Sequence, residues 1–278
     1  MKTLVLYHDN CPDGMTAAWV LWKAIGNVSD FRAVNYGQPA PDISGYERVI
    51  VADFSYPRDV MIDWAAKVNL VVLDHHKTAE ENLRGLPFAT FDMNKSGGHL
   101  AWDWVSMCDN NPMPRIVQFT EDRDLWRWAL PGSREVSQWL RMIPMNLDEW
   151  DMAADELQDD GCFERAVEVG KSLLNFQNQQ VDIMAKRAEI HEVCGYKIPV
   201  TNATCFFSEV GERMCELFPD APCALYYFDR TAKIRQWGLR SRGGFDCTII
   251  AKQFGGGGHP GAAGFTTPIT SILPLETQ

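Results

Sequence analysis

Several hallmarks of other protein classes are missing from this sequence of 278 residues. Its eight cysteines form no C-x-x-C pair, so nothing indicates a zinc ribbon or a redox motif, and the thiols are expected to be reduced. No apolar run approaches the roughly 18 residues of a membrane span. The apolar run at the amino end is too short for the core of a signal peptide. We therefore expect a cytoplasmic protein without membrane contact.

Positive charge is also scarce. Lysine and arginine number 26 against 37 acidic residues, which gives a formal net charge of -11. Proteins that bind long nucleic acids use a broad basic surface that displaces counterions. The sequence therefore disfavours a long nucleic acid as a partner. Any nucleotide that binds should be small, or should be held by local contacts and metal ions.

The first 80 residues alternate between apolar runs and helical patterns. Helical stretches at Met15–Ile25 and Pro57–Lys67 separate three short apolar runs. These runs predict buried strands at Lys2–His8, Arg48–Asp53 and Asn69–Asp74. Strands that alternate with helices indicate a parallel sheet with helical crossovers.

The rest of the chain changes character twice. Residues 97–150 are predicted to be mostly helical, and the stretch from about Phe163 to Glu192 predicts one long helix. Short strands follow at Gly195–Thr201, Pro222–Asp229 and Ala232–Arg240, with a helix near Asp246–Gln253. We therefore predict an α/β protein with a parallel-sheet domain over 1–160, a helical linker over 161–193 and a smaller α/β domain over 194–278.

Titratable side chains stand where each predicted strand ends. They are His8 and Asp13 after the first strand, Asp53 at the second, and Asp74, His75 and His76 at the third. The carboxyl ends of parallel strands share one sheet edge, where open sheets bind ligands. Imidazole and carboxylate together suit Mn, Fe, Zn or Mg. One such residue alone is ordinarily a cap or a turn, but three successive strand ends favour a two-metal site that activates water for attack on phosphorus.

These motifs resemble those of the DHH phosphoesterases. Asp74-His75-His76 after a buried strand matches the motif that gives this family its name, and HDNCPDG, VADFS and FTEDRDLW resemble its first, second and fourth motifs. GGGGHPGAAGF is similar to the signature of the type 1 DHH-associated domain. The resemblance runs from about Leu4 to Phe265. It implies an active site in a cleft between the two domains.

The resemblance also implies roles for individual residues. Two divalent metals, with Mn²⁺ expected and Mg²⁺ as the alternative, would be held by His8, Asp13, Asp53, His75 and Asp122. His76 would bind or protonate the reacting phosphate, and Asp74 would orient a histidine. Asp124 is expected to orient a neighbour or to pair with Arg123 or Arg127.

The sequence departs from many relatives at one position of the first motif. Met15 stands where those relatives have a second aspartate, and the spacing after His8 is one residue longer. The departure implies that one metal has fewer protein ligands, or that Asp9 compensates.

The glycine-rich motif follows a basic segment, residues 228–244 (FDRTAKIRQWGLRSRGG), which has five lysine and arginine residues against one acid. Four glycines before His259 allow close approach of backbone to a ligand, and their N–H groups could form an anion-binding nest. With the resemblance, this predicts substrate binding by Arg240, Ser241, Gly256, Gly257, Gly258 and His259. The segment Lys95–His99 precedes a helix and could bind phosphate, which adds His99 as a candidate, although an ordinary helix start is equally favoured.

The resemblance implies a phosphodiesterase that hydrolyses linear dinucleotides such as pGpG, and very short oligoribonucleotides, to nucleoside monophosphates. Three alternatives stay open. The substrate could be a cyclic dinucleotide or 3′-phosphoadenosine 5′-phosphate, the enzyme could be a single-strand DNA exonuclease, or the chain could be a non-catalytic nucleotide sensor, which Met15 alone favours. Relatives often form dimers, so a homodimer is also left open.

Overall fold

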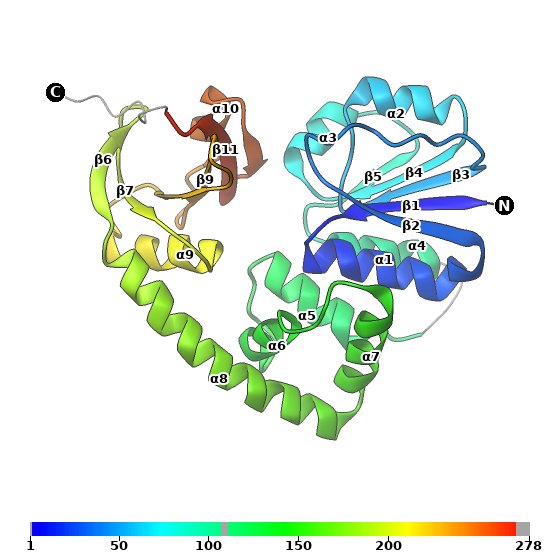
Figure 1. Cartoon of the computed structure of the whole chain (residues 1–278), viewed down its shortest axis with the longest axis horizontal. Coiled ribbons are helices and arrows are strands. Elements are labelled where there is room, and N and C mark those ends of the chain that lie inside the picture. Colours follow the sequence, from blue (N-terminus) through cyan, green and yellow to red (C-terminus); the bar gives the residue numbers. More distant parts are fainter. Residues whose placement is uncertain (1, 107–110, 271–278) are drawn as a thin grey trace. The chain divides into compact units, whose positions relative to one another are not determined.

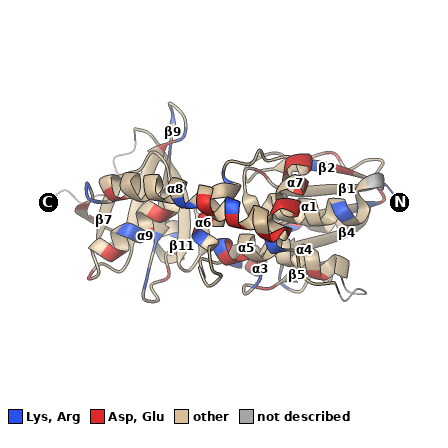
Figure 2. Ribbon diagram, turned by 90° about the horizontal axis from the view of Figure 1, so that it is seen from below, with Lys and Arg blue, Asp and Glu red and all other residues tan. Residues whose placement is uncertain are grey.

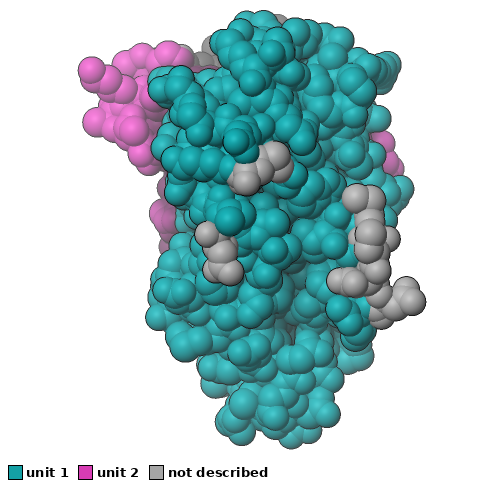
Figure 3. Space-filling view, turned by 90° about the vertical axis from the view of Figure 1, so that its right-hand side faces the viewer, with its two compact units in different colours: residues 1–174 teal, residues 175–278 magenta. Residues whose placement is uncertain are grey.

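The computed structural model describes residues 2–106 and 111–270 of the chain. It divides into two compact units, residues 1–174 and 175–278, coloured teal and magenta in Figure 3. Acidic and basic residues are interspersed over the helices of both units (Figure 2). Within the described ranges, no helix has the length and apolar character that crossing a membrane requires. The predicted domain limits at residues 160 and 194 stay a prediction.

The first unit contains a five-stranded parallel sheet in the order β2-β1-β3-β4-β5. Its strands are β1 (Thr3–His8), β2 (Ser29–Val34), β3 (Arg48–Ala52), β4 (Asn69–Asp74) and β5 (Ala89–Phe91). The three strands predicted from apolar runs are confirmed. The sequence did not predict β2 and β5, because they are the edge strands: β2 is largely exposed and polar, and β5 has only three residues.

Helices cover both faces of this sheet (Figure 1). The 14-residue α1 (Pro12–Ile25), which leads into a short 3-10 turn, and α4 (Gly97–Ser106) lie on one face, and α2 (Arg58–Ala65) and α3 (Lys77–Leu83) lie on the other. Alternate β1 residues enter the two cores, Val5 on the α1 side and Leu4 on the α2 side. Burial on both faces explains why these strands read as continuous apolar runs.

A further helical layer packs against α1. It contains α5 (Arg115–Asp124), α6 (Ser133–Leu140) and α7 (Leu147–Gln158), as predicted for residues 97–150. Ile116, Val136 and Trp150 are fully buried and belong to the same core cluster as α1.

The long helix α8 (Asp160–Ala185) leads from the first unit into the second. The prediction that it continues to Glu192 is wrong, because β6 (Glu189–Val193) takes those residues. β6 pairs with β7 (Tyr196–Asn202) through a two-residue turn, Cys194-Gly195, whose φ values are 53° and 80°. Positive φ at both positions is the geometry of a tight hairpin turn.

The second unit contains a six-stranded sheet in the order β10-β11-β9-β8-β7-β6. Its remaining elements are β8 (Ala224–Asp229), β9 (Ile234–Arg240), β10 (Gly257–His259), β11 (Ala262–Pro268), α9 (Phe207–Leu217) and α10 (Thr248–Gln253). Neighbouring strands are antiparallel except for β7 and β8. The expectation of a smaller α/β domain built on short strands is confirmed.

Candidate metal centre

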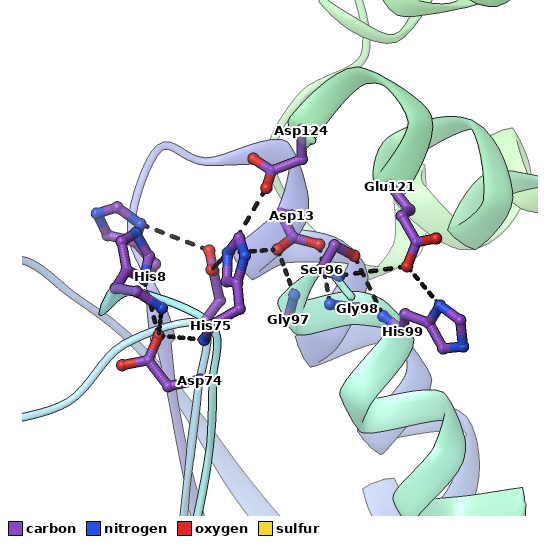
Figure 4. A network of polar contacts seen from close by, with 12 residues as sticks. His8, Asp13, Asp74, His75, Ser96, Gly97, Gly98, His99, Glu121 and Asp124 are labelled. Atoms are coloured by element: carbon purple, nitrogen blue, oxygen red, sulfur yellow. Dashed lines mark hydrogen bonds and ion pairs between the residues drawn. The ribbon is translucent and has the colours of Figure 1, made fainter. Parts of the chain in front are cut away.

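The carboxyl ends of β1, β3 and β4 lie level with one another. In the parallel register, the residue before His8 lies opposite the residue before Asp53, which in turn lies opposite the residue before Asp74. Strand pairing therefore brings the three predicted motifs to one edge of the sheet. Figure 4 shows the resulting cluster of imidazole and carboxylate groups, which Asp13 and Asp124 join from helices.

Asp53 occupies the centre of this cluster. Its Oδ1 lies 3.1 Å from Nε2 of His75, and its Oδ2 lies 3.5 Å from Nδ1 of His8. The side chain is almost fully buried, and its backbone has φ +55°. This left-handed conformation costs a residue other than glycine about 1–3 kcal/mol and concentrates at functional sites. Here it places one carboxylate between two imidazole rings.

Asp13, in the first turn of α1, is held from the start of α4. Its two carboxylate oxygens accept hydrogen bonds from the backbone N–H groups of Gly97 (2.6 Å) and Gly98 (2.8 Å). A Cβ atom on Gly97 would lie 2.5 Å from Cβ of Asp53, so glycine is required for α4 to approach this closely. Asp13 Oδ2 is also 3.6 Å from Nε2 of His75.

The prediction for the fourth motif needs correction, because the structure brings Asp124 and not Asp122 to the cluster. Both carboxylate oxygens of Asp122 accept backbone N–H groups of the following turn, those of Ala129 (2.9 Å) and Leu130 (3.2 Å). Asp124 ends α5, and its Oδ2 lies 3.5 Å from Nε2 of His75. Two positions in a helix separate these aspartates, so they point to different sides of it.

Asp74 orients the last histidine of its motif. Its Oδ1 accepts hydrogen bonds from the backbone N–H groups of His75 and His76, and lies 2.7 Å from Nδ1 of His76. Asp74 is fully buried, and its other oxygen makes no hydrogen bond to any described residue. The ring of His76 is therefore fixed through Nδ1, as expected for an aspartate that orients a histidine.

Burial and mutual charge shift the pKa values of the cluster in different directions. Burial, with the charges of Asp53 and Asp124, raises the pKa of Asp13 well above its usual range. Burial opposes a charged His75 ring, but contact with Asp53 and the charge of Asp13 outweigh it and raise the pKa of His75 to about 10. Burial likewise opposes a charged His76, but Asp74 outweighs it and raises that pKa to about 9. Crowded carboxylates thus share protons that a cation would displace.

The donors fit divalent cations. One group of donor atoms within 4.8 Å of one another comes from His8, Cys11 and Asp53, and a second comes from Asp13, His75 and Asp124. The contact between Asp53 and His75 joins the two groups. In the described part of the chain, neither Nδ1 of His8 nor Oδ2 of Asp53 makes a hydrogen bond, although both are buried. Oxygen and imidazole donors in this mixture suit Mn²⁺ and, less strongly, Mg²⁺.

Three residues in or beside the first motif bear on its set of ligands. Met15 is buried in the core on the α1 side, so no ligand replaces the second aspartate from that position. Asp9 is exposed and belongs to none of the donor groups found among the described residues. Cys11, which precedes α1, was not predicted, and burial together with the charge of Asp53 raises the pKa of its thiol.

His99 belongs to a separate polar network. Its Nδ1 contacts Oε2 of Glu121, which also accepts the backbone N–H of Ser96, and Arg127 binds the other oxygen of Glu121 at 2.7 Å. Of the two interpretations left open for this helix start, the contacts favour the ordinary one, because the N–H groups of Gly97 and Gly98 donate to Asp13. Glu121 was missed although it stands in FTEDRDLW, because the resemblance drew attention to the aspartates of that motif.

The glycine motif of the second unit forms a hairpin and not a nest. The N–H groups of Gly255 and Gly256 donate to carbonyl groups of α10, and Gly257 and Gly258 belong to β10. A Cβ atom on Gly256 would lie 2.1 Å from a carbonyl oxygen of β11, and Gly258 has φ +139°. Close strand contact therefore explains these glycines without an anion.

The hairpin nevertheless gathers three of the predicted substrate-binding residues at one end of the second sheet. His259 lies opposite Ala262 in β11, which lies opposite Arg240 in β9, and the Ser241 N–H donates to Gly261. The Arg240 guanidinium donates to Ser208 Oγ at 2.6 Å.

Part of the basic segment pairs with acids. The guanidinium groups of Arg235 and Arg242 pair with Asp229 and Glu212. Asp229, and Glu212 from α9, therefore offset part of the positive charge of this segment.

No protein-family model matches the chain. An uncharacterized protein of Acanthamoeba polyphaga mimivirus is 26% identical over 302 residues, covering 98% of this chain and 69% of that protein.

Solved structures give a clearer likeness. The DHH domain of a member of the s1p family of ribosomal proteins has a TM-score of 0.59 at 14% identity, over 96% of this chain and 82% of that one. RecJ of Thermus thermophilus in complex with Mn²⁺ has 0.55 at 15%, over 95% and 49%. The pGpG-specific phosphodiesterase PggH of Vibrio cholerae has 0.50 at 12%, over 97% and 94%.

Likeness at these identities establishes the fold. The motifs expected in the first unit meet at one sheet edge, and one of the solved structures with this fold is described as a DHH domain. The resemblance read from the sequence is therefore confirmed at the level of the fold, which the chain shares with that DHH domain.

Proposed function

We propose that this chain is a divalent-metal-dependent phosphodiesterase that hydrolyses linear dinucleotides, such as pGpG, and very short oligoribonucleotides to nucleoside monophosphates. The observation that carries the proposal is the cluster around Asp53, where two imidazoles and three carboxylates meet at the carboxyl edge of the sheet. The fold shared with a pGpG-specific phosphodiesterase supports the choice of substrate class.

In this proposal, five side chains hold two cations, Mn²⁺ by expectation and Mg²⁺ as the alternative. Asp53 contacts a member of each ligand group, His8 in one and His75 in the other, so it would contribute to holding the cations. Such a pair of cations supplies an activated water and neutralises charge on the phosphate. The proposed ligands are His8, Asp13, Asp53, His75 and Asp124.

His76 would act on the substrate itself. Asp74 holds its Nδ1 at 2.7 Å, which leaves Nε2 as the ring atom to meet a phosphate oxygen. Donation of a proton from this ring to the leaving oxygen would complete cleavage of the phosphodiester bond. Asp74 then acts through His76 and is a positioning residue.

The second unit would supply substrate contacts of its own. Arg240, Ser241 and His259 share one end of its sheet and offer cationic and neutral donors to phosphate or base. The hairpin of Gly256, Gly257 and Gly258 would let substrate approach the backbone closely. We further propose that the protein acts in the cytoplasm, and a homodimer is compatible with this function.

A single-strand exonuclease is the second candidate, because the fold is also that of RecJ. The net charge of -11 opposes it, since binding a long strand requires many cationic contacts. The two candidates predict opposite dependence of rate on substrate length.

A product-resolved assay separates these functions. Purified protein with Mn²⁺ would be given oligoribonucleotides of increasing length from the dinucleotide upward, with cyclic dinucleotides, 3′-phosphoadenosine 5′-phosphate and labelled single-stranded DNA alongside. The proposal expects the highest rate on linear dinucleotides, with monophosphate products. Activity that rises with length would support the exonuclease, and an Asp53→Asn variant as active as wild type would reveal a contaminant.

A further inference from the structure

A half-exposed aromatic side chain stands beside the candidate metal centre, in a segment that none of the sequence motifs covers. Tyr36 follows β2 and is 49% exposed. In the parallel register of β1 and β2, Val34 lies opposite His8, so the chain beyond Val34 emerges next to the first metal-ligand candidate. Sequence reasoning missed Tyr36 because β2 itself was not predicted.

The ring of Tyr36 contacts two residues of the cluster. Its centroid lies 5.5 Å from that of His8 and 6.2 Å from that of His76, and both contacts are edge-to-face. His8 is a proposed metal ligand, and His76 is the proposed proton donor. A group that rests on Tyr36 would therefore lie beside both the proposed metal ligand and the proposed proton donor.

Tyr36 is also the exposed end of a row of aromatic rings. Its centroid lies 4.6 Å from that of Phe54, which lies 4.8 Å from Tyr56, which lies 5.3 Å from Trp64. The three inner rings are buried, with exposures of 1%, 4% and 5%. This row anchors Tyr36 in one orientation before any ligand arrives, which lowers the entropy that binding would cost.

We propose that Tyr36 is a stacking platform for a nucleobase of the substrate, and hence a specificity-determining residue at the metal centre. This inference rests on the proposed function and deepens it. Every nucleobase has a flat π-face that stacks on an aromatic ring, with about 1–3 kcal/mol per base. One ribose joins the base to its phosphate, so a nucleotide with its phosphate at the cluster can bring its base onto Tyr36. A ring that served only to close the core would be covered like its three neighbours.

Binding of two small probes tests the platform independently of catalysis. Calorimetry in the presence of Mn²⁺ would measure guanosine 5′-monophosphate, which has a base, and ribose 5-phosphate, which has none. For Tyr36→Ala we expect about 5- to 150-fold weaker binding of the first probe and no change for the second. Tyr36→Phe, which keeps the ring, should bind both probes like wild type.

Tyr46→Ala is the matched control. Tyr46 contacts Asp30 and Lys2 at the amino ends of β2 and β1, the opposite edge of the sheet, so its loss should leave both probes unaffected. With pGpG as substrate, Tyr36→Ala should raise KM by the same factor and change kcat little.

The outcomes separate the platform from the proposed function. Equal loss of both probes in Tyr36→Ala, or no loss of either, overturns the platform, as does wild-type protein that binds ribose 5-phosphate and guanosine 5′-monophosphate equally. Base-dependent binding without hydrolysis of any dinucleotide by wild type would uphold the platform and overturn the phosphodiesterase.

Discussion

The Nε2 atom of His75 lies 3.1 Å from Oδ1 of Asp53, and both side chains are almost completely buried. Asp53 directly follows β3 and His75 directly follows β4, so their contact depends on the register of these two parallel strands. Asp13 and Asp124 approach the same imidazole nitrogen at 3.6 and 3.5 Å. Three carboxylates from different elements thus meet at this nitrogen.

Asp53→Asn should remove metal binding without unfolding the protein. Asparagine also tolerates the left-handed backbone of this position, so the fold should persist. Saturating Mn²⁺ should raise the melting temperature of wild type by about 5–10 °C, and that of the variant by almost nothing. Differential scanning fluorimetry with and without Mn²⁺ measures this, with the exposed Asp63→Asn as control. An equal rise in both aspartate variants would contradict a metal site centred on Asp53.

Asp122 and Asp124 should respond in opposite ways to the same change. Asp124→Asn should reduce the Mn²⁺-dependent rise in melting temperature and leave the metal-free protein nearly as stable as wild type. Asp122→Asn should destabilise the metal-free protein by about 1–3 kcal/mol, because its carboxylate accepts two backbone N–H groups. The metal-dependent rise should survive in that variant. The reverse pattern would restore Asp122 as the ligand.

His76→Gln should separate chemistry from metal binding. Loss of a positioned proton donor lowers kcat by about 10²–10⁴-fold. The Mn²⁺-dependent rise in melting temperature should remain, because His76 is not among the proposed ligands. Steady-state kinetics on pGpG together with melting curves test this, and an unchanged kcat would remove His76 from the mechanism.

Glu121 should make stability depend on pH in the acidic range. Burial opposes its ionisation, but the contact with His99 outweighs this and lowers the pKa of Glu121 below its ordinary value. A lowered folded pKa contributes stability above the unfolded pKa of about 4.3, and that contribution is lost as pH falls through the folded value. Glu121→Gln should therefore cost about 2 kcal/mol at pH 7 and progressively less below pH ~4.

Urea unfolding of Glu121→Gln and wild type across this pH range would measure the difference. The exposed Glu168→Gln should show no such pH dependence. A cost for Glu121→Gln that stays constant down to low pH would exclude an ionised Glu121 as its source.

Gly258→Ala should loosen the hairpin of the second unit. A methyl group there would lie 2.6 Å from the carbonyl oxygen of Ala262, at a φ that only glycine adopts easily. We expect a cost of about 2 kcal/mol and faster amide hydrogen exchange in β10 and β11. Gly261→Ala is the matched control, because the nearest atom to its added methyl group, the Ser241 carbonyl oxygen, would be 4.0 Å away and its φ is ordinary. Equal exchange in both variants would contradict this account of the glycines.

Sequence patterns predicted the parts of this fold in which local and global signals agree. The buried strands of the first sheet are apolar runs in the sequence and could be predicted from them. Their carboxyl ends carry His8, Asp53 and the motif Asp74-His75-His76. The edge strands were missed because exposure leaves them no apolar pattern. The choice between Asp122 and Asp124 depends on which side of α5 faces the sheet, and a motif alone does not contain that information.

The proposed metal ligands span the chain from residue 8 to residue 124 and come from β1, α1, the ends of β3 and β4, and α5. No short segment contains a complete set, so a nascent chain lacks a binding site until more than a hundred residues have left the ribosome and the sheet has paired. The cation would therefore bind a domain that has already folded and would not be needed for folding. Small zinc modules differ, because they are unfolded without their metal. Removal of the metal by a chelator should abolish the activity of such a protein and leave it folded, so that added metal restores the activity.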